Sequence, residues 1–353
     1  MRRFILAAAL LGALASAGQA AAANYKVFLG EQARPPAGTP KGATLDLFLP
    51  GNVTVKTGDS ITFSSASFHT VAIGGKFPSI IVPDPEHGKY AGINDAAGKP
   101  FYFNGLGKLI YNGFALAPFG PHVVTPGVKA SSGVLSPNGP KAAPAVFTFS
   151  FPKAGTYHFY CSVHPNMKAT VVVASGAPPK SPAQVTAQAL QETAAGWAKT
   201  KQAAAAANPP AKTVYMGVGD KETILAFFPP RLSVKAGTTV TFVNKSPQEP
   251  HSAVWGPKKW VQQFSQKTDL FPMGPKAPNQ AAPVIPYGSE PKGQYSYDGK
   301  THGNGFFATP VTSDDRSLPL PQSWKVTFTK PGSYKYICWI HGPDMSGTIV
   351  VTP

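Results

Sequence analysis

An internal repeat is the feature that most constrains how this chain can fold. Residues 48–63 align without a gap on residues 227–242, and seven of the sixteen positions are identical. A second match pairs the segment that contains Cys161 with the one that contains Cys338. The offset is 179 residues for the first match (48 to 227) and 177 for the second (161 to 338). Because the two offsets nearly agree, we interpret the chain as a duplicated unit.

Each unit has the pattern of short β-strands joined by turns. Around residues 53–63 and 232–242, a glycine interrupts alternating β-branched residues, which predicts a strand, a turn and a second strand. Residues 147–151 and 325–329 alternate as half-buried strands do. With 38 prolines and 35 glycines in 353 residues, a mainly helical bundle is excluded. We predict an all-β protein with two Greek-key β-sandwich domains joined by a partly helical linker.

The N-terminus has the pattern of a secretory signal peptide. Two arginines follow Met1, then an apolar stretch, then small residues that offer cleavage sites. We therefore expect export to the periplasm, the cell surface or the medium. The predicted segments are a signal peptide at 1–23, a first domain at 24–174, a linker at 175–212 and a second domain at 213–353.

The linker is rich in Ala, Gln and Pro, and its pattern favours a helix at 182–207. Pro182 suits the first helical position, and the proline pair after Asn208 ends the helix. Val185, Leu190 and Trp197 give it a weak apolar face. The helix is either a spacer that fixes the two domains or a mobile connection, and the need of Trp197 for a docking site favours the spacer.

The net charge of +16 comes from 32 basic and 16 acidic residues that are spread along the chain. A nucleic-acid-binding protein would be expected to gather its Lys and Arg on one face among aromatic residues. We therefore expect no nucleic acid. An acidic protein partner, or peripheral contact with an anionic surface, fits the charge better.

The two cysteines of the chain occupy equivalent places in the two units, and the same residue types surround both. Each is followed by a His three residues later and then by a Met, and each unit has a further His after its early strand pair. The candidate metal ligands are His69, Cys161, His164 and Met167 in the first unit, and His251, Cys338, His341 and Met345 in the second.

This ligand set suits copper. One thiolate and two imidazoles satisfy Cu(I) and still bind Cu(II), and a weak axial thioether biases the redox couple. Zinc fits poorly, because structural zinc takes four strong N or S ligands and Met is not among them. We expect one copper ion in each domain.

Each unit resembles a cupredoxin, a type 1 blue copper protein of the plastocyanin, azurin and amicyanin kind. The loop from Cys161 to Met167 is similar in spacing to that of amicyanin, whereas the loop from Cys338 to Met345 is one residue longer. The resemblance implies electron transfer with a redox partner protein, through exposed imidazole edges of His164 and His341. It also implies an apolar contact rim around these edges, to which Pro165, Gly342 and Pro343 would contribute.

The sequence argues against an enzyme. Copper oxidases and nitrite reductases add histidine-bound copper, often from His-x-His pairs and a His beside the Cys. No His-x-His occurs here, and Ser162 and Trp339 follow the two cysteines. The alternative to an electron carrier is a copper-binding protein for storage, delivery or scaffolding. The sequence has five methionines, fewer than a Cu(I) store would be expected to have.

Two features are left open by the sequence. The segments between the first His and the Cys of each unit are long, and they serve either as a lid or docking surface or as an extension of the sandwich. The four remaining histidines have no partner at ligand spacing, so we expect surface or structural roles for them: His87, His122, His158 and His302.

Overall fold

The computed structural model describes most of the chain outside the predicted signal peptide, of which only residues 21–23 are included. The described residues are 21–30, 35–75, 81–83, 89–102, 108–111, 115, 117–137, 142–164, 166–265, 268–271, 280–286, 288–290, 293–318 and 320–353.

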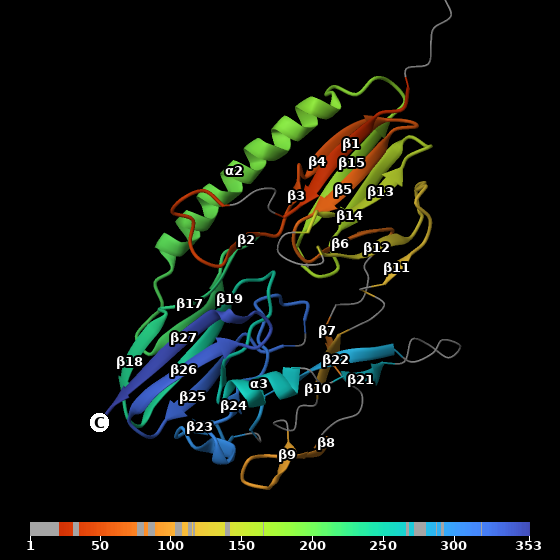
Figure 1. Ribbon diagram of the computed structural model, residues 1–353. Helices are drawn as coiled ribbons and strands as arrows, with labels where there is room; N and C mark the ends of the chain where they lie inside the picture. Colours follow the sequence, from red (N-terminus) through yellow and green to blue (C-terminus); the bar gives the residue numbers. More distant parts are fainter. Residues whose placement is uncertain are drawn as a thin grey trace, which may run out of the picture.

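The first sandwich consists of two sheets packed face to face (Figure 1). One has the order β13-β5-β1-β3 and the other the order β11-β12-β6-β14-β15-β4. The strands are β1 (Asn24–Leu29), β3 (Phe48–Leu49), β4 (Asn52–Lys56), β5 (Ser60–Ser65), β6 (His69–Ile73), β11 (Pro118–Phe119), β12 (Ala130–Leu135), β13 (Ala145–Ser150), β14 (Gly155–Tyr160) and β15 (Lys168–Ala174).

The second sandwich is built in the same way. Its sheets have the orders β2-β17-β16-β19-β25-β23 and β18-β27-β26-β20-β24. The strands are β2 (Ala43–Leu45), β16 (Thr213–Val218), β17 (Glu222–Phe228), β18 (Arg231–Lys235), β19 (Thr238–Lys245), β20 (Val254–Trp255), β23 (Ser296–Tyr297), β24 (Phe307–Ala308), β25 (Ser323–Phe328), β26 (Gly332–Cys338) and β27 (Gly342–Thr352).

The two sandwiches share one topology. Strands β3-β1-β5-β13 of the first correspond to β17-β16-β19-β25 of the second, and β4-β15-β14-β6-β12 correspond to β18-β27-β26-β20-β24. The parallel pairs recur as well, since β1 lies parallel to β5 as β16 does to β19. The prediction of an all-β protein with two β-sandwiches and a partly helical linker is confirmed.

The repeated sequence supplies the core of each sandwich. The aligned pair Phe63 and Phe242 is fully buried, and each ring contacts further aromatic side chains. In the second sandwich, Trp255 packs within 5.5 Å of Phe242 between ring centroids and within 5.1 Å of Tyr336. The alternation of the strands places such rings on the inner faces, where their burial stabilises the fold.

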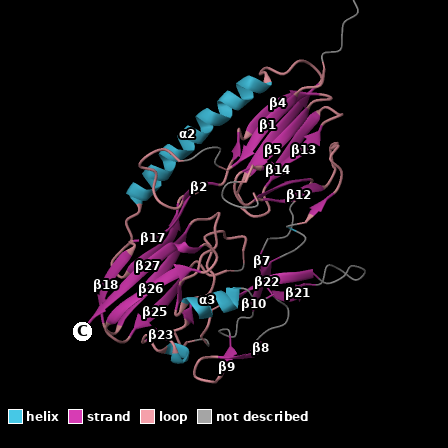
Figure 2. Ribbon diagram, in the orientation of Figure 1, coloured by secondary structure: helices cyan, strands magenta, loops and turns pink. Residues whose placement is uncertain are grey.

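Helix α2 (Pro182–Ala206) runs beside both sandwiches (Figure 2). Ser181 caps it, with the capping box completed by Gln184. Its 25 residues span about 38 Å at 1.5 Å per residue. The helix contacts β1 and β3 of the first sandwich and β17 of the second. Among the described residues, no helix is sufficiently long and apolar to span a membrane.

The buried face of α2 differs in part from the predicted one. Val185, Ala189 and Trp197 are buried, and Trp197 docks with Leu45. The prediction for Leu190 is wrong, because its side chain is 54% exposed. Leu190 follows Ala189 by one residue, which turns it about 100° around the helix, away from the i, i+4 row of the buried face. This docking supports the spacer interpretation of the linker.

Strand β2 ties the two halves together. It precedes the first sandwich strand β3 in the chain but pairs with β17 at the edge of the second sandwich. Just beyond it, the Asp46 amide donates to the Lys221 carbonyl at 2.8 Å. The N-terminal part of the chain therefore completes a sheet of the C-terminal part.

The long segments between the first His and the Cys also meet each other. Strand β10 (Lys108–Tyr111) of the first segment pairs with β22 (Gln280–Pro286) of the second, in a sheet of order β21-β22-β10-β7. Described backbone of both segments therefore forms one shared sheet that joins the two halves. The remaining elements of these segments are β7 (Ile81–Pro83), β8 (Lys89–Asn94), β9 (Pro100–Tyr102), α3 (Lys258–Ser265), β21 (Thr268–Phe271) and η1 (Thr301–Gly303).

His302 makes a second connection between the two segments. Its Nδ1 lies 3.0 Å from an Asp95 carboxylate oxygen and its Nε2 lies 2.8 Å from a Glu290 carboxylate oxygen. Burial lowers the pKa of His302, but hydrogen bonds and charges of Glu290 and Asp95 outweigh it, and the net pKa lies above 6.5. His302 is thus a structural residue that links Asp95 of one half to Glu290 of the other.

We expect Trp197→Ala to destabilise the protein by about 3–5 kcal/mol, because it removes a large buried side chain from the cluster that α2 forms with Leu45 and Leu49 at the junction of the two sandwiches. Denaturant unfolding of the full chain measures this loss. Leu190→Ala is the matched control on the same helix, and its free energy of unfolding should stay within about 0.5 kcal/mol of the wild type. Equal losses in the two variants would contradict the docking of α2.

We expect His302→Asn to destabilise the protein more at about pH 6 than at about pH 9. The raised pKa makes the ion-paired imidazolium contribute fully below about pH 6.5, and that contribution is lost as the pH rises through the folded-state pKa. Asn tolerates the left-handed backbone at this position, where φ is 56°. Denaturant unfolding at both pH values gives the difference, with the exposed His158→Asn as control. A difference that does not change with pH would argue against the ion pairs.

Candidate metal centres

The first group of candidate ligands gathers at one end of the first sandwich. His69 begins β6, Cys161 follows β14 directly, and His164 lies in the turn before β15. The Nδ1 atoms of His69 and His164 are 3.0 Å apart, and the Cys161 Sγ lies 3.6 Å from the His164 Nδ1. All three side chains are buried. Three strands that meet at this end therefore bring residues 91 to 95 positions apart into contact.

The second group has the same arrangement. His251 lies before β20, Cys338 ends β26 and His341 lies in the following turn. The Nδ1 atoms of the two histidines are 3.1 Å apart, and the Cys338 Sγ lies 3.8 Å from that of His251 and 3.4 Å from that of His341. The duplicated topology thus produces the same cluster twice.

Both clusters have the dimensions of a metal site. Donor atoms that bind one such ion at about 2.0–2.3 Å lie about 3–4.5 Å from one another. The distances between donor atoms above are 3.0–3.8 Å, and each His–Cys–His group lies within 4.8 Å overall. A thiolate with two imidazoles is a donor set that copper prefers. The residues therefore fit a copper ion in each sandwich.

The two thiols are held in the form that binds metal. Burial by itself raises the pKa of the Cys161 thiol, but hydrogen bonds and charges of His164 and His69 outweigh it and hold the pKa well below the usual range. Burial also raises the pKa of the Cys338 thiol, but charges and hydrogen bonds of His341 and His251 outweigh it and hold this pKa well below the usual range. The Thr70 amide also donates to the Cys161 Sγ at 3.3 Å. A thiolate is the nucleophilic, metal-binding form of Cys.

Both methionines are buried in the same core as the Cys of their own sandwich. Met167 and Cys161 belong to the core of the first sandwich, and Met345 and Cys338 to that of the second. Met167 lies in the turn, where its carbonyl accepts from the Cys161 amide at 3.0 Å. Met345 lies inside β27, because this strand begins at Gly342. The longer second loop is thus partly absorbed into a strand.

One glycine in each sandwich makes room for the first histidine. A Cβ on Gly30 would lie 2.7 Å from the His69 Nε2, and a Cβ on Gly217 would come closer still to the His251 Nε2. The φ angles of the two glycines are +72° and +67°, which L-residues rarely adopt. Backbone can approach these imidazoles only because no side chain intervenes.

Comparison with known families agrees with this chemistry. A family model described as copper binding proteins of the plastocyanin/azurin family matches residues 213–352. Residues 213–352 belong to this cupredoxin family. The first sandwich has the same strand order and the same cluster as this cupredoxin segment. No curated protein matches the chain.

Solved cupredoxin structures are similar to part of the chain. Amicyanin from Paracoccus versutus is 21% identical over 42% of this chain and 89% of its own, with a TM-score of 0.23. A mutant plastocyanin of a fern is 20% identical over 40% of this chain and 99% of its own, with a TM-score of 0.22. A purple cupredoxin from Nitrosopumilus maritimus is 20% identical over 40% and 100%, with a TM-score of 0.22.

The expectation of exposed imidazole edges is wrong. His164 is 5% exposed, and its Nε2 lies 2.9 Å from a Glu249 carboxylate oxygen. The Nε2 of His341 lies 3.2 Å from the other oxygen of Glu249. How the two domains pack against each other is not a local sequence pattern, so the sequence could not show that the two edges face each other. Pro165, expected beside His164 at a contact rim, lies outside the described residues.

Glu249 and Asp46 are site residues that the sequence analysis missed. Glu249 stands two residues before His251, where the first unit has Ser67 two residues before His69. Asp46 lies 3.8 Å from the His164 Nε2. Burial raises the pKa of Asp46 to about 6 despite His164, whereas His164, at hydrogen-bond distance, outweighs burial and lowers the pKa of Glu249. A Glu two residues before a candidate ligand His, where the other unit has a Ser, was the sequence signal that could have identified Glu249.

The remaining histidines lie away from the two clusters. His122 and His158 are exposed, and the His122 ring packs 4.4 Å from that of Phe147. His302 makes the ion pairs described above, and His87 lies outside the described residues.

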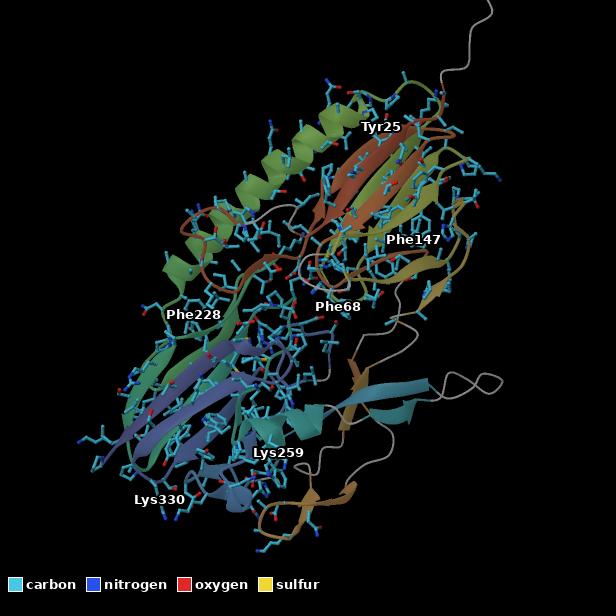
Figure 3. The ribbon with its side chains drawn as sticks, viewed as in Figure 1. Tyr25, Phe68, Phe147, Phe228, Lys259 and Lys330 are labelled. Carbon is cyan, nitrogen blue, oxygen red and sulfur yellow. The ribbon has the colours of Figure 1, made fainter. Side chains whose placement is uncertain are left out.

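Figure 3 shows which end of the first sandwich carries the first cluster. Phe68, which directly precedes His69, lies at the end opposite Tyr25, towards the second sandwich.

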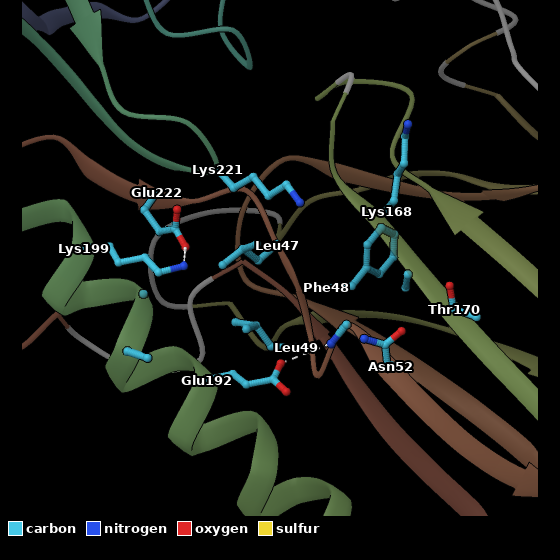
Figure 4. A pocket seen from close by; sticks show the side chains of 14 residues that line it. Leu47, Phe48, Leu49, Asn52, Lys168, Thr170, Glu192, Lys199, Lys221 and Glu222 are labelled. Carbon is cyan, nitrogen blue, oxygen red and sulfur yellow. Dashed lines mark hydrogen bonds and ion pairs between the residues drawn. The ribbon is translucent and has the colours of Figure 1, made fainter. Parts of the chain in front are cut away.

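A cavity of about 330 Å³ lies elsewhere, between α2 and the first sandwich (Figure 4). Lys168 lines it, and so does the ion pair between Lys199 and Glu222 at 2.9 Å. Leu47 and Phe48 form part of its apolar wall. None of its lining residues belongs to either His–Cys–His cluster, so this cavity is separate from the two candidate metal centres.

We expect Gly30→Ala and Gly217→Ala to lower the copper affinity of their own sandwich by about tenfold to a hundredfold, because the added Cβ displaces an imidazole. Copper titration against a competing chelator measures the affinity. Gly58→Ala and Gly237→Ala are matched controls, since both positions have a positive φ but nothing within 4 Å of the added Cβ. The interpretation fails if the control variants lose as much affinity.

Proposed function

We propose that this chain is an exported electron-transfer protein that carries one type 1 copper centre in each sandwich. The observation that carries the proposal is the pair of buried His–Cys–His clusters, each with a Met in the same core. Copper, when bound, supplies a one-electron couple between Cu(I) and Cu(II). The ligands proposed are His69, Cys161, His164 and Met167, and His251, Cys338, His341 and Met345.

The surrounding fold supports rapid electron transfer. The proposed ligands lie on strands, on a short turn between two strands or, for His251, in a β-bridge with Thr312, so their side chains can move little. In the first turn, the Met167 amide donates to the His164 carbonyl at 3.0 Å, which fixes the loop that carries both residues. A site whose ligands keep one geometry in both oxidation states needs little rearrangement when an electron arrives. Burial also keeps water from the ion.

The partner and location proposed follow from the sequence. A net charge of +16 favours an acidic redox partner and would speed its approach at low salt. The signal-peptide pattern supports export. Because Glu249 covers the imidazole edges of His164 and His341, the partner would dock on another part of the surface.

The alternative, a protein that stores or delivers copper, is distinguished by what is transferred. An electron carrier keeps its metal while it is reduced and reoxidised by a partner. A delivery protein gives its metal to a chelator or to an apo-protein. The buried thiolates favour the carrier, because a ligand set enclosed by a sandwich releases its ion slowly.

We expect the copper-loaded protein to show intense visible absorption and a type 1 paramagnetic resonance signal, both lost on reduction. Cys161→Ser and Cys338→Ser should each reduce the copper content from two ions per chain to one and remove one of two spectral components, because the thiolate makes the strongest bond to copper. Metal analysis and spectra of both variants test this.

His158→Ser is a control, since this exposed residue lies outside both clusters. A colourless protein after copper loading, or an unchanged spectrum in either Cys variant, would refute the assignment of that centre.

A further inference from the structure

Glu249 occupies a special position between the two candidate copper centres. Its Oε1 lies 2.9 Å from the Nε2 of His164, and its Oε2 lies 3.2 Å from the Nε2 of His341. Both histidines turn their Nδ1 towards their own cluster, so each Nε2–H is free to donate outwards. One carboxylate therefore accepts hydrogen bonds from a ligand of each sandwich, and Glu249 is only 8% exposed.

The repeat shows that this residue departs from the arrangement of the first unit. At the equivalent position, Ser67 places its Oγ 2.9 Å from the Nε2 of its own His69. In the second unit the longer Glu249 reaches away from its own histidine, and the His251 Nε2 has no hydrogen-bond partner among the described residues. Where Ser67 contacts only a candidate ligand of its own sandwich, Glu249 forms a bridge between candidate ligands of both sandwiches, His164 and His341.

Further contacts hold the bridge in place. The Asn166 amide, in the ligand turn of the first sandwich, donates to the Oε1 of Gln248 at 3.0 Å. The Glu249 carbonyl accepts from the Asn244 side chain at 2.8 Å. Since Gln248 and the Glu249 backbone are both held, the carboxylate is kept against both imidazoles, which are charge-assisted donors when they bind a cation.

We propose that Glu249 couples the two copper centres, so that an electron passes between them inside the molecule along His164, Glu249 and His341. This inference rests on the proposed presence of a redox copper in each sandwich. The path runs through the imidazole ring of one ligand, its Nε2–H···O hydrogen bond, the carboxylate and the second hydrogen bond to the other ring.

The step is balanced within the protein. With copper bound in both sandwiches, one centre would be oxidised from Cu(I) to Cu(II) as the other is reduced from Cu(II) to Cu(I), so no external oxidant or reductant would be needed. Each Nε2 keeps its proton, and no covalent bond of the protein forms or breaks. Because the negative charge is shared by two imidazoles, it also stabilises the more positive state of both centres.

The first test measures the Cu(II)/Cu(I) equilibrium of each centre separately. Glu249→Gln is introduced into Cys161→Ser and into Cys338→Ser, which each keep one centre. We expect the equilibrium constant of both remaining centres to shift towards Cu(I) by about tenfold, the effect of losing one charge-assisted hydrogen bond. Asp46→Asn is the charge-matched control, since Asp46 lies beside His164 and should shift the first centre more than the second.

The second test follows electron exchange. Met345→Gln marks the second centre, because a changed axial ligand alters its spectrum and potential. After a pulse that delivers less than one electron per molecule, we expect a redistribution between the centres whose rate does not depend on protein concentration. Glu249→Gln should slow this phase, and Glu249→Asp, which keeps the charge but shortens the side chain, should slow it with a smaller shift of the equilibrium constants. His158→Ser, at an exposed position outside both clusters, should leave this phase unchanged.

The outcomes separate this inference from the proposed function. Absent type 1 spectra in the single-centre variants would refute the copper assignment itself. With the spectra present, a redistribution unchanged by Glu249→Gln, or an equilibrium shift at one centre only, would overturn the bridge. A third metal ion per chain that is lost in Glu249→Gln would also overturn it, because the carboxylates of Glu249 and Asp46 would then bind an ion in place of the imidazole N–H groups.

Discussion

The structure depends on the convergence of a buried thiolate and two imidazoles at one end of each sandwich. Donor atoms 3.0–3.8 Å apart would repel one another or remain unsatisfied without a shared cation or proton. Backbone pairing keeps them there. His69 and Cys338 lie at the ends of paired strands, Cys161 directly follows one, and His251 forms an isolated β-bridge with Thr312. The interiors behind them are filled by aromatic side chains, whose close packing leaves these ligands little freedom.

Duplication alone would give two independent sites, but the two halves are joined by four kinds of contact. Helix α2 packs on both sandwiches, and β2 adds to a sheet of the second. The segments that interrupt each unit share a sheet through β10 and β22, and His302 links a carboxylate of each. The ligand turns face each other in this assembly, which is why Glu249 reaches both His164 and His341.

The asymmetry of the pair has a physical cause in one position of the repeat. Ser67 is short and can reach only the imidazole of its own sandwich, whereas the Glu249 side chain is longer and carries two acceptor oxygens. A buried carboxylate is costly unless it is hydrogen-bonded, and two imidazole N–H groups meet that need. Asp46, farther from His164, keeps a raised pKa at the same junction. The junction between the sandwiches is therefore charged and buried, unlike the exposed apolar rim that the resemblance implied.

The sequence by itself determined the duplicated β-sandwich and the eight candidate ligands, because strand alternation, glycine turns and the Cys-x-x-His spacing are local patterns. It also placed α2 to within about one residue of its end. It could not determine which side chains of α2 are buried, what the long segments pair with, or what lies beside each imidazole edge. Those features depend on how the two halves pack, and packing joins residues such as Asp46, His164 and Glu249 that are far apart in the chain. Only the tertiary structure decided that the two centres face one shared carboxylate.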